Sequence, residues 1–128
     1  AREILGNKPV NLERLIRGGG HCRCRLLANP SVTRAGKRHG LVREEEQLAW
    51  LERQGKKRGF DLLGCVRGSS VRLQARQGGN GRHITLQTAL FEGALKVTNA
   101  ESLRSTVRQG VGHGKAMGLG LLSLARLA

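Results

Sequence analysis

One stretch near the end of the chain combines residue types that can bind a phosphate group. Residues 110–120 hold five glycines in eleven positions, with Lys115 at the centre. Glycine permits positive φ and lets a ligand approach the main chain closely. Consecutive exposed amides form a concavity that suits phosphate oxygens, and the lysine adds a full charge. The pattern predicts a phosphate-binding loop, with a plain turn as the alternative.

Two familiar nucleotide-binding loops do not fit this spacing. A Walker loop requires a glycine where Gln109 stands and Ser or Thr where Ala116 stands. The dinucleotide fingerprint requires a third glycine where Lys115 stands. The loop also follows a predicted helix and precedes an apolar run, which reverses the usual strand–loop–helix order. These features argue against nucleotide binding in either mode.

Composition points to a polyanionic partner. The 128 residues are enough for one domain, and they carry 17 arginines, six lysines and a formal charge of +14. Arginine recognises phosphate in a planar, bidentate manner, so a nucleic acid is favoured over a membrane surface. Trp50, Phe60 and Phe91 are the only aromatic residues, and each lies in an apolar context. Phosphate and groove contacts must then dominate over base stacking, which favours a folded RNA such as a hairpin stem.

The three cysteines argue against a disulfide framework and for a reducing cytoplasm. Cys22 and Cys24 fall on one face of a predicted strand, the usual setting of buried thiols, and Cys65 is left over. A zinc site built from these three and His21 is an alternative, but the C-x₂-C spacing is missing. No metal or other cofactor is therefore expected.

The first half of the chain predicts a strand and a helix. Residues 1–20 are expected to be the remnant of an interdomain connection, and residues 21–128 the domain itself. His21–Ala28 alternates as a strand with arginines on one face. Residues 31–40 are expected to be a loop, either simply solvated or a flexible phosphate clamp. A helix follows, opened by three glutamates from Glu44 and ended by Gly55, with its inner side formed by Leu41, Leu48 and Leu51.

The second half predicts three strands and a second helix. Residues 60–66 form a short strand or the approach to one, and residues 71–75 form a half-buried strand led by Val71. Arg82–Val97 returns after a glycine-rich turn, with a bulge at Phe91. Asn99 caps the second helix, Gly110 ends it, and residues 119–124 close the sheet as a central strand. This order is β-α-β-β-α-β, so we predict an α+β, ferredoxin-like fold with a four-stranded antiparallel sheet.

The predicted hairpin carries a second group of cations. Arg76, Arg82 and His83 lie around its tip, Arg72 lies further back on its first strand, and few acidic residues accompany them. A basic two-stranded ribbon can enter a nucleic-acid groove. The alternative is an exposed hairpin whose charges keep a sheet edge soluble.

The sequence resembles a known protein family. Its glycine-rich loop resembles that of the RAMP-type CRISPR RNA endoribonucleases, and further motifs resemble the CasE family, the type I-E subunit that processes repeat RNA within Cascade. These motifs are RLLANP (25–30), GKR (36–38), QLAWL (47–51), FEGAL (91–95) and GKAMGLGLLSL (114–124).

The resemblance implies two ferredoxin-like domains, of which this chain holds the C-terminal one. It implies metal-independent cleavage at the base of a repeat stem-loop, where the ribose 2′-OH attacks the adjacent phosphate and leaves a 2′,3′-cyclic phosphate and a 5′-OH. A histidine and a tyrosine of the N-terminal domain serve that step in the family. This chain has no tyrosine, so no catalytic residue is assigned and the chain alone is expected to be inactive. His113 is read as an RNA contact, with acid–base work as its alternative.

The RNA-binding residues expected in all are Gly110, Gly112, His113, Gly114, Lys115, Gly118 and Gly120 in the loop, Lys37 and Arg38 before the first helix, and Arg72, Arg76 and Arg82 in the hairpin. Expected partners are a CRISPR repeat stem-loop and other Cascade subunits, with no membrane. We also expect a possible homodimer through the face left by the missing domain. The expected location is a prokaryotic cytoplasm. The alternative functions are a non-catalytic basic RNA-binding module and, less well matched to the charge, a regulator that binds a small phosphate ligand.

Overall fold

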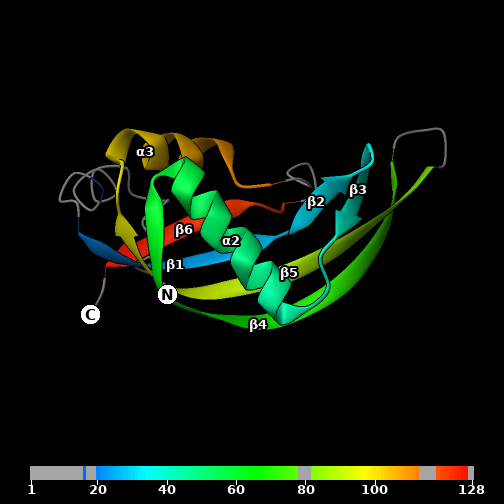
Figure 1. Cartoon of the computed structure of the whole chain (residues 1–128), viewed down its shortest axis with the longest axis horizontal. Helices are drawn as coiled ribbons and strands as arrows, with labels where there is room; N and C mark the ends of the chain where they lie inside the picture. Colours follow the sequence, from blue (N-terminus) through cyan, green and yellow to red (C-terminus); the bar gives the residue numbers. More distant parts are fainter. Residues whose placement is uncertain (1–15, 17–19, 78–81, 113–117, 127–128) are drawn as a thin grey trace.

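The computed structural model describes residues 16, 20–77, 82–112 and 118–126. Four strands form one antiparallel sheet: β1 (His21–Ala28), β4 (Phe60–Gln77), β5 (Arg82–Val97) and β6 (Leu121–Arg126). The order across the sheet is β4-β5-β1-β6. Two helices, α2 (Glu44–Arg58) and α3 (Ala100–Gln109), complete the β-α-β-β-α-β order of a ferredoxin-like fold (Figure 1). The predicted fold class is confirmed, but β6 is an edge strand and not a central one.

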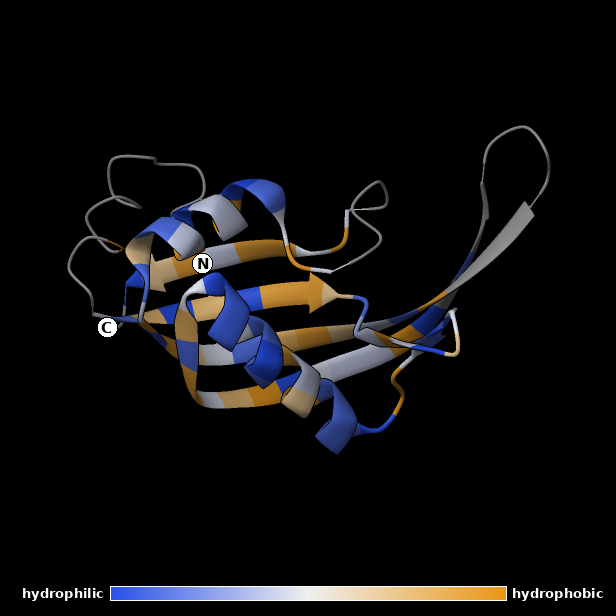
Figure 2. Ribbon diagram, turned by 45° about the horizontal axis from the view of Figure 1, so that its top comes forward, coloured by the Kyte–Doolittle hydropathy of each residue, from blue (hydrophilic) through white to orange (hydrophobic). Residues whose placement is uncertain are grey.

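Both helices pack on the same face of the sheet. α2 contacts β4, α3 contacts β6, and the two helices contact each other. Side chains of β1 alternate between exposed and buried along its whole length, as the sequence pattern predicted. Figure 2 shows hydrophobic and hydrophilic segments alternating along the strands and mostly hydrophilic residues along the two helices. Ile16, from the segment expected to be an interdomain connection, is fully buried in this core; the rest of that segment, apart from Gly20, lies outside the described residues.

The segment expected to be a loop at residues 31–40 is a β-hairpin, so that expectation was wrong. β2 (Ser31–Arg34) and β3 (Lys37–Gly40) pair antiparallel around a two-residue turn. Both turn residues have positive φ, 51° at Ala35 and 78° at Gly36, as a primed hairpin turn requires. Alanine is rare in that conformation, which is why the turn was not predicted from the sequence.

Helix α2 is one turn longer than predicted. It runs past Gly55 to Arg58 and ends at Gly59, which has a φ of +94° and donates its amide to the Gly55 carbonyl. Gly55 serves packing instead, because a Cβ there would stand 2.5 Å from the carbonyl oxygen of Phe60. Helix α3 matches the prediction at both ends: the Asn99 side chain accepts a 3.0 Å bond from the Ser102 amide, and Gly110 ends the helix.

Strand β4 is continuous over residues 60–77, where the sequence predicted a short strand or strand approach at 60–66 and a strand at 71–75, and the bulges of the β4–β5 pair lie in β4. The pairing register shifts between Leu62 and Gly64 and again between Arg67 and Ser70. The predicted bulge at Phe91 therefore lies in the neighbouring strand, close to the same place in the sheet. Val71 was predicted to be half-buried and is 52% exposed, because the strand has left the sheet there.

Candidate nucleic-acid interface

The described ends of the glycine-rich loop are built on positive φ. Gly110, Gly112, Gly118 and Gly120 have φ values of 90°, 82°, 81° and 87°. L side chains rarely adopt this region, so the glycines are required by the backbone path. His113, Gly114 and Lys115, which carry the predicted charge, lie outside the described residues. Their roles stay predictions.

Main-chain bonds close the base of the loop. The Val111 amide donates to the Gly120 carbonyl at 2.8 Å, and the Gly120 amide donates to the Leu27 carbonyl at 2.7 Å. The Gly110 amide donates to Thr106 at the end of α3. These three amides are committed within the fold, so phosphate binding by main-chain amides would have to come from the part of the loop between them.

The loop is also fixed against the core. A Cβ on Gly112 would stand 3.2 Å from the Trp50 ring, which in turn stacks on Phe91 with 6.3 Å between ring centroids. Arg58, at the end of α2, donates to the Gly110 carbonyl at 3.3 Å. The position of the loop is thereby tied to the helix face of the sheet.

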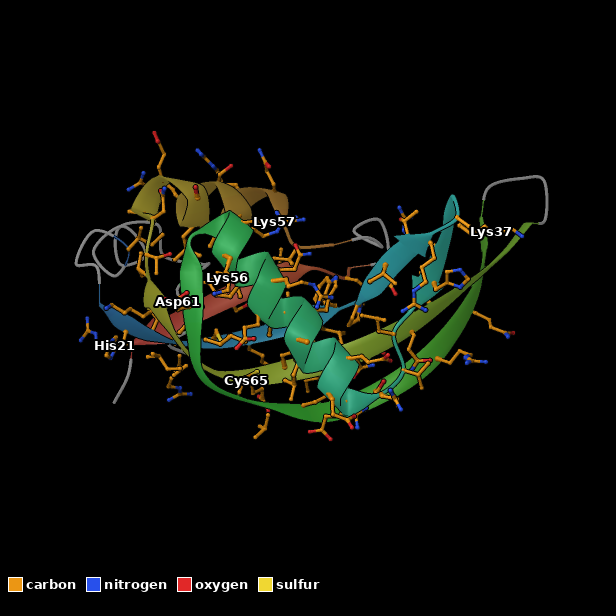
Figure 3. The ribbon with its side chains drawn as sticks, viewed as in Figure 1. His21, Lys37, Lys56, Lys57, Asp61 and Cys65 are labelled. Carbon is orange, nitrogen blue, oxygen red and sulfur yellow. The ribbon has the colours of Figure 1, made fainter. Side chains whose placement is uncertain are left out.

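The β2–β3 hairpin presents the first described group of cations. Arg34, Lys37, Arg38 and His39 are all exposed, and Figure 3 shows Lys37 near the hairpin tip. The base of the hairpin is closed by a 2.9 Å bond from the Leu41 amide to the Pro30 carbonyl. The cations expected on a flexible loop therefore stand on paired strands.

The second group of cations lies on the far end of β4 and β5. β1 pairs with β5 only as far as Ala28 and Ala89. Beyond that point β4 and β5 continue without β1 as a two-stranded ribbon, residues 71–77 and 82–88. Arg72 is exposed on this ribbon, and the backbone register pairs Arg76 with His83 and Arg82 with Gln77. The ribbon and the β2–β3 hairpin rise from the same end of the sheet (Figure 1). The three predicted hairpin arginines thus lie on one projecting element.

The two projections carry no acidic residue of their own. Residues 31–40 and 70–88 contain no aspartate or glutamate. The three glutamates at the start of α2 lie beside the hairpin, because Glu45 and Glu46 line a surface hollow together with Arg34. Glu44 pairs with Arg67 at 3.6 Å and Glu46 with Arg43 at 3.9 Å, so neither of these ion pairs uses a cation of the hairpin or the ribbon. Those cations are available to an external anion.

The cysteines are structural. Cys22 and Cys24 are buried under the helices, and Cys65 is partly buried. Burial raises the pKa of Cys24 to about 12, with smaller contributions from neighbouring Cys65 and Cys22. Within the described part of the chain, no three His, Cys, Asp or Glu side chains come together as a metal site. The zinc alternative therefore gains no support from this part of the chain.

Sequence reasoning missed a buried polar group at the foot of the ribbon. Gln47 of α2 is fully buried, and Thr88 of β5 is 4% exposed. The sequence did offer one sign of this buried group, because Gln47 stands next to Leu48 on the inner side of an amphipathic helix. The leucines of that helix drew attention away from the glutamine.

The fold and its basic projections define an antiparallel α+β domain of ferredoxin-like topology with a cationic ribbon. The chain belongs to the CRISPR associated protein family, whose model matches residues 5–126. The resemblance expected from the sequence motifs is confirmed.

Two relatives show how much of a longer protein this chain represents. It is 41% identical to the CRISPR-associated endoribonuclease Cse3 of Thermus thermophilus, covering 91% of this chain and 61% of that protein. It is 38% identical to the Cascade subunit CasE of Escherichia coli, covering 68% of this chain and 42% of that protein. The chain therefore spans less than two thirds of the length of either relative.

Solved structures agree with these relationships. Thermus thermophilus Cse3 bound to an RNA representing a pre-cleavage complex matches with a TM-score of 0.76 at 41% identity, over 84% of this chain and 54% of that one. Escherichia coli Cas6e matches with a TM-score of 0.67 at 33% identity, over 85% and 62%. The helices in the described part of the chain contain no apolar stretch that could span a lipid bilayer.

Proposed function

We propose that this chain is the RNA-recognition part of an endoribonuclease that processes CRISPR repeat RNA. The observation that carries the proposal is the pair of acid-free basic projections, the β2–β3 hairpin and the β4–β5 ribbon, at one end of the sheet. A basic two-stranded ribbon can lie along a nucleic-acid groove, and its arginines can contact the phosphates of a folded RNA. The naming of two relatives as an endoribonuclease and a Cascade subunit supports the same assignment.

In this proposal each basic element has its own task. Arg72, Arg76 and Arg82 lie along the RNA stem, Lys37 and Arg38 lie on its cleavage side, and Lys115 contacts a backbone phosphate. Cleavage proceeds without a metal, by attack of the ribose 2′-OH on the adjacent phosphate. The groups that move protons in that step belong to a preceding domain, so this chain binds and positions the RNA without cutting it.

The proposed partners are other Cascade subunits and a second copy of this chain. The protein acts in a prokaryotic cytoplasm with other Cascade subunits. Leu27, Val66 and Leu121, on the sheet face away from the helices, are 41%, 63% and 66% exposed. A second copy of the chain would cover this apolar surface when the preceding domain is absent. Sedimentation equilibrium over a range of concentrations tests that homodimer.

Binding measurements separate the proposal from its alternative. A CRISPR repeat stem-loop should compete better than an unrelated duplex of equal length and charge, whereas a non-catalytic basic RNA-binding module would bind both equally. Lys115→Ala should lower the slope of log K against log salt by about one unit, because one phosphate contact is lost. An unchanged slope would remove Lys115 from the interface. Metal-free scission by this chain alone would contradict the proposed division of labour and direct attention to His113.

A further inference from the structure

The foot of the ribbon is the place where the sheet stops and two strands continue alone. The last rung shared with β1 pairs Ser70 with Ala89, and the next rung, Val71 with Thr88, belongs to the ribbon only. The register shift in β4 falls directly before this point, so that Gly68 and Ser69 together face Leu90. A bulge of this kind bends the strand and redirects the residues beyond it. The direction of the ribbon is therefore decided here.

Side chains, rather than ladder bonds alone, hold this bend. The Thr88 hydroxyl donates to the Val71 carbonyl at 2.8 Å and accepts from the Val71 amide at 3.3 Å. The Ser70 hydroxyl donates to the Thr88 carbonyl at 2.7 Å and accepts from the Gln87 amide group at 2.9 Å. Both strands of the ribbon are thus pinned to each other at their first rungs.

Gln47 joins this foot to the β2–β3 hairpin. Its amide nitrogen donates to the Leu41 carbonyl, just past the end of β3, at 2.8 Å, and to the Ser70 hydroxyl at 3.2 Å. One fully buried side chain therefore bonds to the base of each basic projection. The hairpin also rests on the ribbon directly, because a Cβ on Gly40 would stand 3.1 Å from the Cβ of Gln87.

The chemistry of Gln47 shows that it does more than fill space. A buried polar group is unfavourable unless it is hydrogen-bonded, and no group in the described part of the chain donates to the Gln47 Oε1. Leucine or methionine would fill the same volume without that penalty. The Leu41 carbonyl requires a donor, so it fixes which way the amide points. What glutamine adds is a hydrogen-bonded link, here called the tie, between the β2–β3 hairpin and the β4–β5 ribbon.

We infer that Gln47 is a positioning residue that fixes the angle between the β2–β3 hairpin and the β4–β5 ribbon, so that the cations of both reach the same RNA stem. The RNA part of this inference rests on the proposed function. Arg72 shares its rung with Gln87, the residue on which Gly40 rests, so the ribbon cation nearest its foot stands beside the hairpin. Electrostatic contacts from both elements then add, since each neutralised phosphate increases the salt dependence of binding.

The tie is tested first without RNA. Nitroxide labels on Thr33→Cys and Gln74→Cys, two exposed positions on the hairpin and ribbon, report the distance between these elements by pulsed electron paramagnetic resonance. The background carries Cys65→Ala, because Cys22 and Cys24 are buried. Gln47→Met should broaden the distance distribution. Gln54→Met, the same change two turns along α2, should leave it narrow, because Gln54 accepts a bond from Arg58 of its own helix. An unchanged distribution in Gln47→Met would refute the inference.

Binding of a fluorescein-labelled CRISPR repeat stem-loop provides the second readout. Gln47→Met should weaken binding about tenfold and lower the salt slope by more than one unit, although no charge is removed. If Gln47 contributed to stability alone, Gln47→Met would lower the melting temperature, measured by Trp50 fluorescence. The salt dependence of RNA binding by the folded variant would then be unchanged. Ser70→Ala breaks the tie from the ribbon side and serves if Gln47→Met does not fold. A broadened distribution without stem-loop binding by the parent chain would refute the RNA assignment and leave the tie itself standing.

Discussion

Two glycines of the loop allow the structural demand for glycine to be separated from any demand made by RNA. Gly118 and Gly120 have nearly the same φ, 81° and 87°. An added Cβ on Gly118 would meet no described residue within 4 Å, whereas one on Gly120 would stand 2.5 Å from the Val111 carbonyl oxygen. Gly120 also bonds through its amide and its carbonyl to Leu27 and Val111. Alanine at the two positions should therefore have very different effects.

The magnitudes can be worked out from these contacts. At Gly118 the left-handed conformation costs alanine about 1–2 kcal/mol, and the reduced freedom of the unfolded chain offsets about 0.4–1 kcal/mol of that. At Gly120 the same strain applies, overpacking adds about 1–3 kcal/mol, and each of two disturbed hydrogen bonds adds about 1 kcal/mol. We expect a loss of about 1 kcal/mol for Gly118→Ala and about 4 kcal/mol for Gly120→Ala.

Urea unfolding followed by Trp50 fluorescence measures both variants. With a slope of about 2 kcal/mol per molar urea, the midpoint should fall by about 0.5 M in Gly118→Ala and about 2 M in Gly120→Ala. Circular dichroism of the native states checks that the fold is kept. Equal midpoints would show that the crowding at Gly120 relaxes freely and that the reasoning is wrong. RNA affinity lost in Gly118→Ala without loss of stability would assign that glycine to the interface.

Three further predictions concern the core and its edges. Gly93→Ala should prevent stable folding, because its Cβ would run into the Gly64 carbonyl, and a cooperative thermal transition near that of the parent would contradict this. Asn99→Ala should lower the free energy of unfolding by about 1 kcal/mol through loss of the cap, while Asn99→Asp keeps an accepting oxygen and should retain most of it; equal losses would refute the capping role. Burial raises the pKa of Cys24 in the folded protein to about 12, above its ordinary value of 9.0. The contribution of the Cys24 thiol to stability should therefore be lost as pH rises from 9 toward 12. At pH 8 this thiol should react with a disulfide reagent only when the protein unfolds. Rapid modification in the native state, with Cys65→Ala as the background, would show that the site is open.

The periodic parts of the sequence were sufficient to predict the elements of the fold. Alternation in His21–Ala28 predicted β1 and its buried face, and Asn99 and Gly110 marked both ends of α3. These signals are local: a side-chain period of two, a capping oxygen and a glycine with positive φ act within a few residues. The glycine-rich loop was recognisable for the same reason, although its lysine lies outside the described residues. Family membership likewise rested on short motifs whose residues are fixed in order.

Tertiary structure decided what no local signal encodes. Whether residues 31–40 form a loop or a hairpin depended on a turn with Ala35 at positive φ. Gly55 packs against the ring and carbonyl of Phe60, and it is Gly59 that ends α2. The role of Gln47 arises only because Leu41 and Ser70, six and 23 residues away, meet its amide in three dimensions. The sequence by itself determined which groups could bind an anion and which elements would carry them. The packing between elements determined where those groups point, because the direction of a ribbon is set by long-range contacts at its base.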